Sequence, residues 1–378
     1  MQTYDLRKYE DKKGNILFEV NKTLWGLPQA GILSRQRLCT HLASLGYHEC
    51  PNTPGLFWHE TRNVSFVLVV DDFLVKFQHK EDSQHLIDSL TAQGMYAIRT
   101  NDKANKFLGF HIDYNKTTRE ICIDLHAYIA KMLVRHYPNG PPPRQKSPAV
   151  YKQQDYGKPG PQFAEEPDSS PRLPDPLVKH IQKVVGSLLY FAVALDTTIL
   201  PAVTAIASAQ AHPTQAVLEA LDHLVGYVAY NQHNKVVFRA SSMRMHCATD
   251  VSHQSRPGSR GVAAALFYCG DSVDPSLLNG AIDAYSSLIS VVTGSVAETE
   301  YAGVFLAAQR GAGLRTTLSD LKYPQPETII FCDNSCAVGL ASDTVKAKRS
   351  KAIDKRFHWV RDRIKSFGDK GQLILQIF

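Results

Sequence analysis

Four acidic residues in the last third of the sequence could do metal chemistry together. Asp250 and Asp333 each follow a short β-rich apolar run, Glu300 lies on a predicted helix between those runs, and Asp354 lies early in the final predicted helix. A carboxylate near an apolar core is costly unless a cation or a hydrogen-bond donor accompanies it. Four that converge could hold two divalent ions about 3.5–4 Å apart, an arrangement suited to phosphodiester hydrolysis. Hard oxygen ligands favour Mg²⁺, or Mn²⁺, over zinc.

Each of these carboxylates, taken alone, has a more ordinary explanation. An aspartate after a strand is most often a turn residue or a helix N-cap. The order Asp-Glu-Asp-Asp on a β-β-β-α-β-α scaffold is more specific than any single member of it. Glu298 is an alternative to Glu300, because the two flank the apolar stripe of their helix on opposite sides and periodicity does not choose between them.

A second acidic pair, Asp71 and Asp72, lies in the run LVVDDF. The β-branched and aromatic residues on both sides predict a hairpin with the carboxylates at its tip. An isolated Asp-Asp pair usually marks only a surface turn. The strongly apolar flanks favour a site where something holds the two charges near a core.

The composition is that of an ordinary globular protein. The chain has 378 residues, of which 44% are hydrophobic and 21% charged, and its formal net charge is +6. That charge is compatible with nucleic-acid binding but does not establish it. The seven cysteines form no C-x-x-C pair, so neither a disulfide framework nor a zinc site is predicted. The polar N-terminus and the lack of a long apolar run predict an intracellular protein without a secretory signal or a membrane span.

One change of composition divides the chain. The segment Pro138–Pro176 holds 11 of the 20 prolines, and proline fixes φ and removes backbone donors, which predicts an extended tether. An ordered loop wrapped on a domain is the alternative. We therefore predict four parts: residues 1–137, the tether 138–176, a helical connection 177–240 and a mixed domain 241–378.

Hydrophobic periodicity predicts the elements of these parts. Before the tether we expect a turn and a helix over 23–47, the hairpin at LVVDDF, a helix over 81–94 and a second hairpin over 106–125. After it we expect helices over 177–195, 199–210 and 216–231, then the order β-β-β-α-β-α-α-β from Met245. In the final helix, 350–368, a buried stripe is predicted from Ile353, Phe357, Val360, Ile364 and Phe367.

The C-terminal motifs resemble the ribonuclease H domain of copia-type LTR retrotransposons. The matching stretches are CATDVSHQSRPGSRGVAAALFYCG, SVAETEYAGVFLAAQ, FCDNSCAVGLAS and KRSKAIDKRFHWVRDRI. The resemblance implies that Asp250, Glu300, Asp333 and Asp354 are the catalytic metal ligands. It favours Glu300 over Glu298, because Glu300 directly precedes the Tyr-Ala pair as in the family.

The N-terminal motifs resemble the reverse transcriptase palm of the same polyproteins. LVVDDF has Val69 where the family has an aromatic residue, and NKTLWGLPQAGILSRQRL resembles the family's Gly-Leu-x-Gln-Ala segment. KFLGF resembles the segment that supports the primer end, and the helical stretches up to residue 231 resemble the thumb and connection. The resemblance implies that Asp71 and Asp72 bind metal and that Gln29 lies against the incoming nucleotide and template.

Two departures from the family affect the expected activity. The aspartate that the family's palm supplies from a strand upstream of the Gly-Leu-x-Gln-Ala segment has no counterpart here, and most of the fingers are absent. Nucleotidyl transfer needs carboxylates from two separate strands, so this chain alone is expected to polymerise poorly or not at all. The sequence also stops after QLILQIF, where the family continues into one more helix. We therefore expect a fragment truncated at both ends.

A basic run accompanies the last of the four carboxylates. Residues 346–365 carry nine Lys or Arg against two Asp, which by itself usually means a solvated helix face. Beside a two-metal site the same run could bind hybrid phosphates. His358 lies beside the apolar stripe, so a packed histidine is favoured over a catalytic one. The predicted nucleic-acid contacts are Lys346, Lys348, Arg349, Lys351, Lys355 and Arg356.

The sequence thus predicts an α+β or α/β multidomain chain: a partial reverse transcriptase palm with a helical thumb and connection, then a ribonuclease H-like mixed sheet with helices. The expected activity is two-metal hydrolysis of RNA in RNA–DNA hybrids with Mg²⁺. The expected partners are the hybrid and template-primer nucleic acid, with no membrane and with room for association with other polyprotein products. A cytoplasmic particle and the nucleus are not distinguished. The alternative is a catalytically silent, nucleic-acid-binding relic or co-opted module; an unrelated α/β enzyme has little support, since P-loop, G-x-G-x-x-G and G-x-S-x-G motifs are absent.

Overall fold

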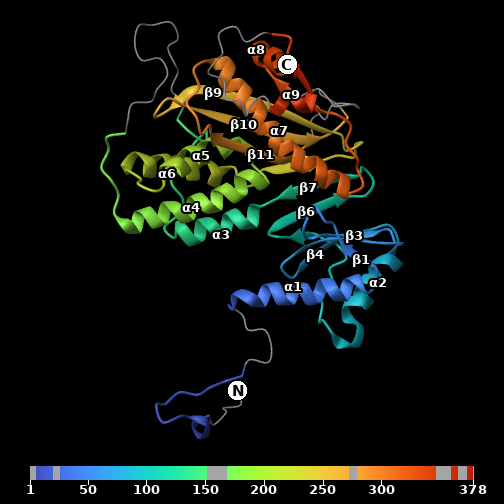
Figure 1. Ribbon diagram of the computed structural model, residues 1–378. Coiled ribbons are helices and arrows are strands. Elements are labelled where there is room, and N and C mark those ends of the chain that lie inside the picture. The colour runs from blue at the N-terminus through green and yellow to red at the C-terminus, as the bar shows by residue number, and fades with distance from the viewer. Residues whose placement is uncertain are drawn as a thin grey trace. The chain divides into compact units, whose positions relative to one another are not determined.

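The computed structural model describes residues 6–19, 26–150, 168–271, 279–345, 359–364 and 373–377. Contacts within the chain separate it into two compact units, Met1–Asn101 and Asp102–Phe378. Apolar cores form inside each unit. Figure 1 shows the helices and strands of both.

The first unit is an antiparallel sheet covered by helices. Its strand order is β1-β2-β3-β4, with β1 at Tyr47–Glu49, β2 at Leu56–His59, β3 at Val64–Val69 and β4 at Asp72–Phe77. The other elements are α1 (Pro28–Ala43), α2 (Lys80–Thr91) and the 3₁₀ turns η1 (Arg7–Tyr9) and η2 (Ala92–Gly94). Leu42 of α1 and Leu86 of α2 share a buried core with Tyr47, Phe57 and Phe66. The predicted hairpin at LVVDDF and the helix that follows it are confirmed.

The second unit begins with an antiparallel sheet and a group of helices. The sheet order is β5-β6-β7-β8, with β5 at Lys106–Phe107, β6 at Phe110–Asn115, β7 at Glu120–Asp124 and β8 at Lys235–Phe238. The helices are α3 (His126–His136), α4 (Asp175–Ala194), η3 (Thr197–Ile199), α5 (Leu200–Ala209) and α6 (Gln215–Tyr230). Apolar residues at helical spacing on α3 to α6 form one core, whose fully buried members include Ile129, Val184, Phe191, Val203 and Leu224. The helices that periodicity predicts over 177–195, 199–210 and 216–231 are present as α4, α5 and α6.

A five-stranded mixed sheet completes the second unit. Its strand order is β11-β10-β9-β12-β13, formed by β9 (Met245–Arg256), β10 (Arg260–Cys269), β11 (Ala281–Leu288), β12 (Thr328–Cys332) and β13 (Leu373–Ile377). The first three strands pair antiparallel, whereas β12 runs parallel to both β9 and β13. The helices are α7 (Val296–Asp320), α8 (Ser335–Ala341) and α9 (Trp359–Ile364). The predicted ribonuclease H-like mixed sheet with helices is therefore present.

The two faces of this sheet are covered by different helices. Because side chains alternate along a strand, Ala265 and Phe267 of β10 face the core beneath α7, while Leu266 between them faces the helical core. On that second face the Thr204 Oγ1 atom of α5 donates a hydrogen bond to the Ser286 carbonyl oxygen at 3.0 Å. The sheet thus lies between α7 on one side and α4 and α5 on the other (Figure 1).

The described ends of the predicted tether lie against the helices rather than apart from them. The Arg144 guanidinium lies 3.1 Å from the ring centre of Tyr230 on α6, and His223 Nε2 donates to the Ser147 carbonyl oxygen at 3.0 Å. At the other end, the Gln215 amide donates to the Pro171 carbonyl oxygen at 2.9 Å. Residues 151–167, the centre of the tether, lie outside the described residues. At both described ends, the alternative of an ordered loop fits better than an extended tether.

Strand pairing also crosses the predicted domain boundaries. Strand β8 belongs to the predicted connection, yet it pairs antiparallel with β7 of the predicted first part. The separation into compact units falls after Asn101. Composition marks where regular structure stops, but it does not reveal which segments on its two sides pair with each other. Our four-part division remains a prediction.

Helix α4 is long and apolar enough to cross a membrane by length and composition, and it is the one such helix in the described part of the chain. Its fully buried residues, among them Ile181, Val184 and Leu188, pack in the helical core. One such helix is weak evidence for a membrane span, since core helices meet the same criteria.

Candidate active site

Strand register brings two of the predicted carboxylates side by side. Phe331 of β12 pairs in parallel with Ala248 of β9. Asp333 lies two residues after Phe331, and Asp250 lies two residues after Ala248. Because the two strands run parallel, the two aspartates are at the same height along the strands. Both side chains are exposed. Strand β12 ends at Cys332, directly before Asp333, whereas Asp250 is the sixth residue of the 12-residue β9. The two acids thus lie at the end of the β9–β12 pairing.

Glu300 reaches this end from α7. It is the fifth residue of the helix and is 5% exposed. Ligand atoms of Glu300, Cys332 and Asp333 all lie within 4.8 Å of one another, and Cys332 Sγ is 3.8 Å from Glu300 Oε2. Asp250 is not a member of this group of three. Its Oδ1 accepts a 2.8 Å hydrogen bond from the Val251 amide.

Negative charge and burial together change the acidity of the buried carboxyl. Burial raises the pKa of Glu300 from 4.5 to about 7, with further contributions from the charges of Asp333 and then Asp250. Asp250 is therefore close enough to repel a charge on Glu300. Burial likewise raises the pKa of the Cys332 thiol to about 11. A cation held among these groups would relieve the repulsion, which is how clustered carboxylates mark candidate functional sites.

The structure gives Glu298 and Glu300 different surroundings. Ser295 caps the N-terminus of α7, its Oγ accepting a hydrogen bond from the Glu298 amide at 3.2 Å. Glu298 Oε2 in turn accepts from the Gly294 amide at 2.8 Å. This is a variant of the capping box, in which a Ser and a Glu three residues later satisfy free amides of the first turn. Glu298 is thus occupied by the helix end, while Glu300 lies beside Asp333.

A hydrogen-bonded chain holds β9 to α7 next to these acids. The His253 Nδ1 atom of β9 lies 2.6 Å from the Thr299 Oγ1 atom of α7. Thr299 Oγ1 also lies 2.6 Å from Thr293 Oγ1, and both threonines are buried. Because Thr299 directly precedes Glu300, these contacts fix the start of α7 against the strand that carries Asp250.

The donor set fits a divalent cation. Carboxylate oxygens of Glu300, Asp333 and Asp250 are hard ligands of the kind that hold Mg²⁺ or Mn²⁺. Cys332 is a soft ligand that we did not predict. A signal for it existed in the sequence, since it directly precedes a predicted ligand at a strand end.

The remaining predicted residues of the C-terminal site lie outside the described residues. These are Asp354 and the six basic residues Lys346, Lys348, Arg349, Lys351, Lys355 and Arg356. In the last helix Val360 is fully buried and Ile364 packs against the same core, as the apolar stripe predicts. Ile353, Phe357 and Phe367 of the stripe are not described.

The predicted polymerase residues lie in the first unit and are all exposed. Val69 and Asp72 pair across the β3–β4 hairpin, which leaves Val70 and Asp71 as its two-residue turn. Val70 adopts φ = +59°, a left-handed conformation that is strained for a β-branched residue. Gln29 lies in the first turn of α1. Within the described ranges, neither aspartate of the tip belongs to a group of three possible metal ligands.

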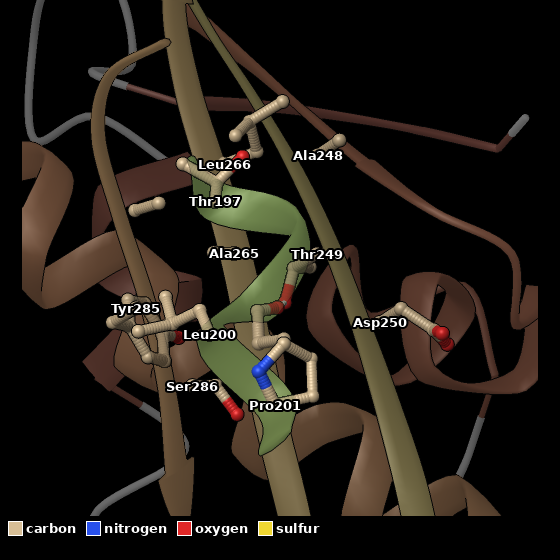
Figure 2. Close-up of a pocket in the computed structure, with 12 residues that line it drawn as sticks. Thr197, Leu200, Pro201, Ala248, Thr249, Asp250, Ala265, Leu266, Tyr285 and Ser286 are labelled. Atoms are coloured by element: carbon tan, nitrogen blue, oxygen red, sulfur yellow. Dashed lines mark hydrogen bonds between the residues drawn. The ribbon is translucent and has the colours of Figure 1, made fainter. Parts of the chain in front are cut away.

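A pocket lies against β9. It is formed between the start of α5 and strands β9 to β11, and it is lined mainly by apolar side chains such as Leu200, Pro201 and Leu266 (Figure 2). Asp250 is on its edge, and Figure 2 shows the carboxylate pointing away from it. Asp250 thus borders the pocket, whereas Glu300 and Asp333 are not among the residues that line it.

Comparison with known proteins identifies the class of chain. No protein-family model matches it. Its homologues are retrovirus-related Pol polyproteins of plant transposons, and the predicted kinship with retrotransposon polyproteins is confirmed. It is 23% identical over 368 residues to the Pol polyprotein from transposon TNT 1-94 of Nicotiana tabacum, covering 97% of this chain and 26% of that protein. It is 23% identical over 365 residues to that from transposon RE1 of Arabidopsis thaliana, covering 93% of this chain and 23% of that protein. The chain thus spans about a quarter of the length of these relatives.

Solved structures of related type are more distant. The foamy viral protease-reverse transcriptase, solved in complex with an RNA/DNA hybrid, is 13% identical with a TM-score of 0.44, covering 94% of this chain and 38% of that one. The N-terminal RNase H domain of a Mycobacterium tuberculosis protein, solved as a fusion with maltose-binding protein, is 18% identical with a TM-score of 0.22, covering 32% of this chain and 72% of that one.

Proposed function

We propose that the C-terminal part of the chain, residues 241–378, hydrolyses the RNA strand of RNA–DNA hybrids in a Mg²⁺-dependent reaction. The observation that carries the proposal is the convergence of Glu300 and Asp333, with Asp250 at the same level of the sheet. The kinship with Pol polyproteins supports the same class of reaction. The narrower assignment to a copia-type element is also part of this proposal.

The proposed metal ligands differ in their exposure to solvent. Asp333 and Asp250 are exposed and accessible to substrate phosphate and solvent, whereas Glu300 is buried behind them. Asp354 is proposed as the fourth ligand. Two Mg²⁺ ions, when bound, activate the attacking water and stabilise the leaving oxygen. Because Glu300 must give up its proton to act as a ligand, Mg²⁺ binding should strengthen as pH rises toward about 7.

We propose that the substrate is bound by shape rather than by base sequence. A hybrid is distinguished by its 2′-hydroxyls, its phosphates and its helical geometry. The basic residues in 346–356 are proposed to contact phosphates, which would make binding fall steeply with salt.

The polymerase half is proposed to be weak or inactive in this chain alone. Asp71 and Asp72 sit on one exposed hairpin tip, and in the described part of the chain they gather no third metal ligand. Nucleotidyl transfer requires carboxylates from separate strands around both ions. Template-primer binding near Gln29 is compatible with this proposal, since binding does not require the ions.

A labelled RNA–DNA hybrid tests the nuclease proposal. Incubation with Mg²⁺ should give RNA cleavage by the parent chain and not by Asp333→Asn, whose exposed side chain can change without disturbing the core. Asp320→Asn is the matched control, because Asp320 lies 20 residues beyond Glu300 on α7, which is about 30 Å at 1.5 Å per residue. It should cleave like the parent. Silence of all three proteins with retained hybrid binding would refute the proposal and favour a binding module.

A further inference from the structure

The carboxylate cluster contains a thiol that hydrolysis with Mg²⁺ does not use. Cys332 is fully buried, yet its Sγ atom lies 3.8 Å from Glu300 Oε2 and within 4.8 Å of a carboxylate oxygen of Asp333. Mg²⁺ prefers oxygen ligands, whereas sulfur is a good ligand for softer ions such as Zn²⁺. One wall of the site therefore has a different ligand chemistry from the rest.

The spacing of these atoms suits one ion between Cys332 and Glu300, with a carboxylate oxygen of Asp333 within 4.8 Å of both. Zinc binds thiolate at about 2.3 Å and carboxylate oxygen at about 2.0–2.2 Å. In a tetrahedral site those bond lengths put the sulfur and oxygen atoms about 3.6 Å apart. The Cys332–Glu300 distance of 3.8 Å is close to that edge without any rearrangement of the backbone.

We propose that Cys332, Glu300 and Asp333 together bind a thiophilic divalent cation, Zn²⁺ or Cd²⁺, which excludes Mg²⁺ from the same place. On binding, the S–H bond of Cys332 breaks, a sulfur–metal bond forms and the proton leaves to solvent, with no change of oxidation state. The binding step needs only the cluster. The consequence for catalysis, inhibition by the soft ion, rests on the proposed nuclease function.

The burial of two of the three ligands, Glu300 and Cys332, favours tight binding once the ion has entered. Glu300 and Cys332 form a buried inner wall, and exposed Asp333 provides the approach from solvent. The repulsion among Glu300, Asp333 and Asp250 is relieved by a divalent charge whichever metal supplies it. The thiol adds the preference for a soft ion, because an oxygen-only site lacks it.

The nearest competing thiol provides a matched control. Cys336 lies four residues further on, in α8, and is exposed. A surface cysteine can bind Cd²⁺ or Zn²⁺ weakly by itself. Comparing serine substitutions at the two positions therefore separates the cluster from an ordinary accessible thiol.

Titration of the full chain with Cd²⁺ tests the binding step directly. Formation of a sulfur–cadmium bond gives a ligand-to-metal charge-transfer band in the ultraviolet. The parent and Cys336→Ser should both show a saturable band, and Cys332→Ser should lose it. Asp333→Asn keeps the thiol and should show the band only at roughly tenfold or more higher Cd²⁺, the scale on which ligand environment changes metal affinity.

Because Cys332 is buried, its serine variant must first be shown to fold, by a thermal melt matched to the parent. If it does not, Asp333→Asn decides the question, since an unchanged Cd²⁺ affinity in that variant would overturn the proposal. A band that persists in Cys332→Ser and disappears in Cys336→Ser would also overturn it.

Inhibition is measured separately on the RNA–DNA hybrid in excess Mg²⁺. Each protein is compared with its own uninhibited rate, and Cys332→Ser should need at least about tenfold more Zn²⁺ for half inhibition than the parent and Cys336→Ser. Equal sensitivity of an active Cys332→Ser would refute the inhibitory role. A parent that shows the Cd²⁺ band but cleaves no hybrid would leave the metal site standing and remove the proposed nuclease function.

Discussion

Glu300→Gln should make the chain more stable at alkaline pH while it abolishes the proposed activity. An acid whose pKa is higher in the folded than in the unfolded chain keeps its proton between those two values only when folded. The contribution of Glu300 to the free energy of unfolding is therefore most favourable below its unfolded pKa of about 4.5, and it is lost as the pH rises to its folded pKa of about 7. Glutamine resembles the protonated acid and carries no charge at any pH.

The magnitude follows from the size of that shift. A change from 4.5 to about 7, at 1.36 kcal/mol per unit, gives an upper bound of about 3 kcal/mol. Burial is the largest cause of the shift in pKa, and the further contribution of Asp333 and Asp250 is screened by water because both are exposed. About 1–2 kcal/mol is therefore the expected gain. At pH 5 the parent carboxyl is largely protonated, and the variant should have nearly the parent's stability.

Urea unfolding in EDTA at pH 5 and pH 8.5 measures this difference without divalent ions. Glu298→Gln is the matched control, because Glu298 accepts the Gly294 amide at the helix end and should not reproduce the alkaline gain. Adding Mg²⁺ at pH 8.5 should then stabilise the parent more than Glu300→Gln. Equal differences between parent and Glu300→Gln at the two pH values, or a less stable variant at pH 8.5, would refute the reasoning.

Three further outcomes are expected. Gly303→Ala places a Cβ against the Val251 Cγ1 atom, so that α7 must move off β9; the variant should lose about 1–3 kcal/mol of stability in thermal melts and most hybrid cleavage. Gly313→Ala lies in open space on the same helix and should be neutral or stabilising. Equal effects of the two substitutions would contradict the packing of α7 on β9. Gly226→Ala meets a loop carbonyl oxygen at 2.2 Å and should lower the urea midpoint, whereas Gly186→Ala, with no atom within 4 Å, should not lower it; an unperturbed Gly226→Ala would show that the loop does not pack there. Primer extension with dNTPs and Mg²⁺ should give little or no product, and robust incorporation would contradict the proposed weakness of the polymerase half.

The sequence alone determined what depends on neighbours along the chain. The β-branched and aromatic runs on both sides of the Asp pair predicted the β3–β4 hairpin. Helical spacing predicted α4, α6 and α7, because burial of one face repeats with the period of the helix. Periodicity was less informative for α1, where Ile32 lies at near-helical spacing with Leu42 yet is 61% exposed. The spacing of apolar residues predicts which face of a helix can be buried. It does not predict how much of the helix length is covered by packed elements.

Only the tertiary structure decided which side chains meet. Periodicity does not distinguish Glu298 from Glu300. In the structure Glu298 accepts a hydrogen bond at the first turn of α7, whereas Glu300 lies beside the end of β12. Cys332 also belongs to the site only through a tertiary contact, because it lies 32 residues beyond Glu300 in the sequence. The pairing of β7 with β8 likewise crosses the proline-rich segment that composition had marked as a boundary. Long-range contacts of this kind depend on strand register and helix packing, which local patterns constrain only weakly.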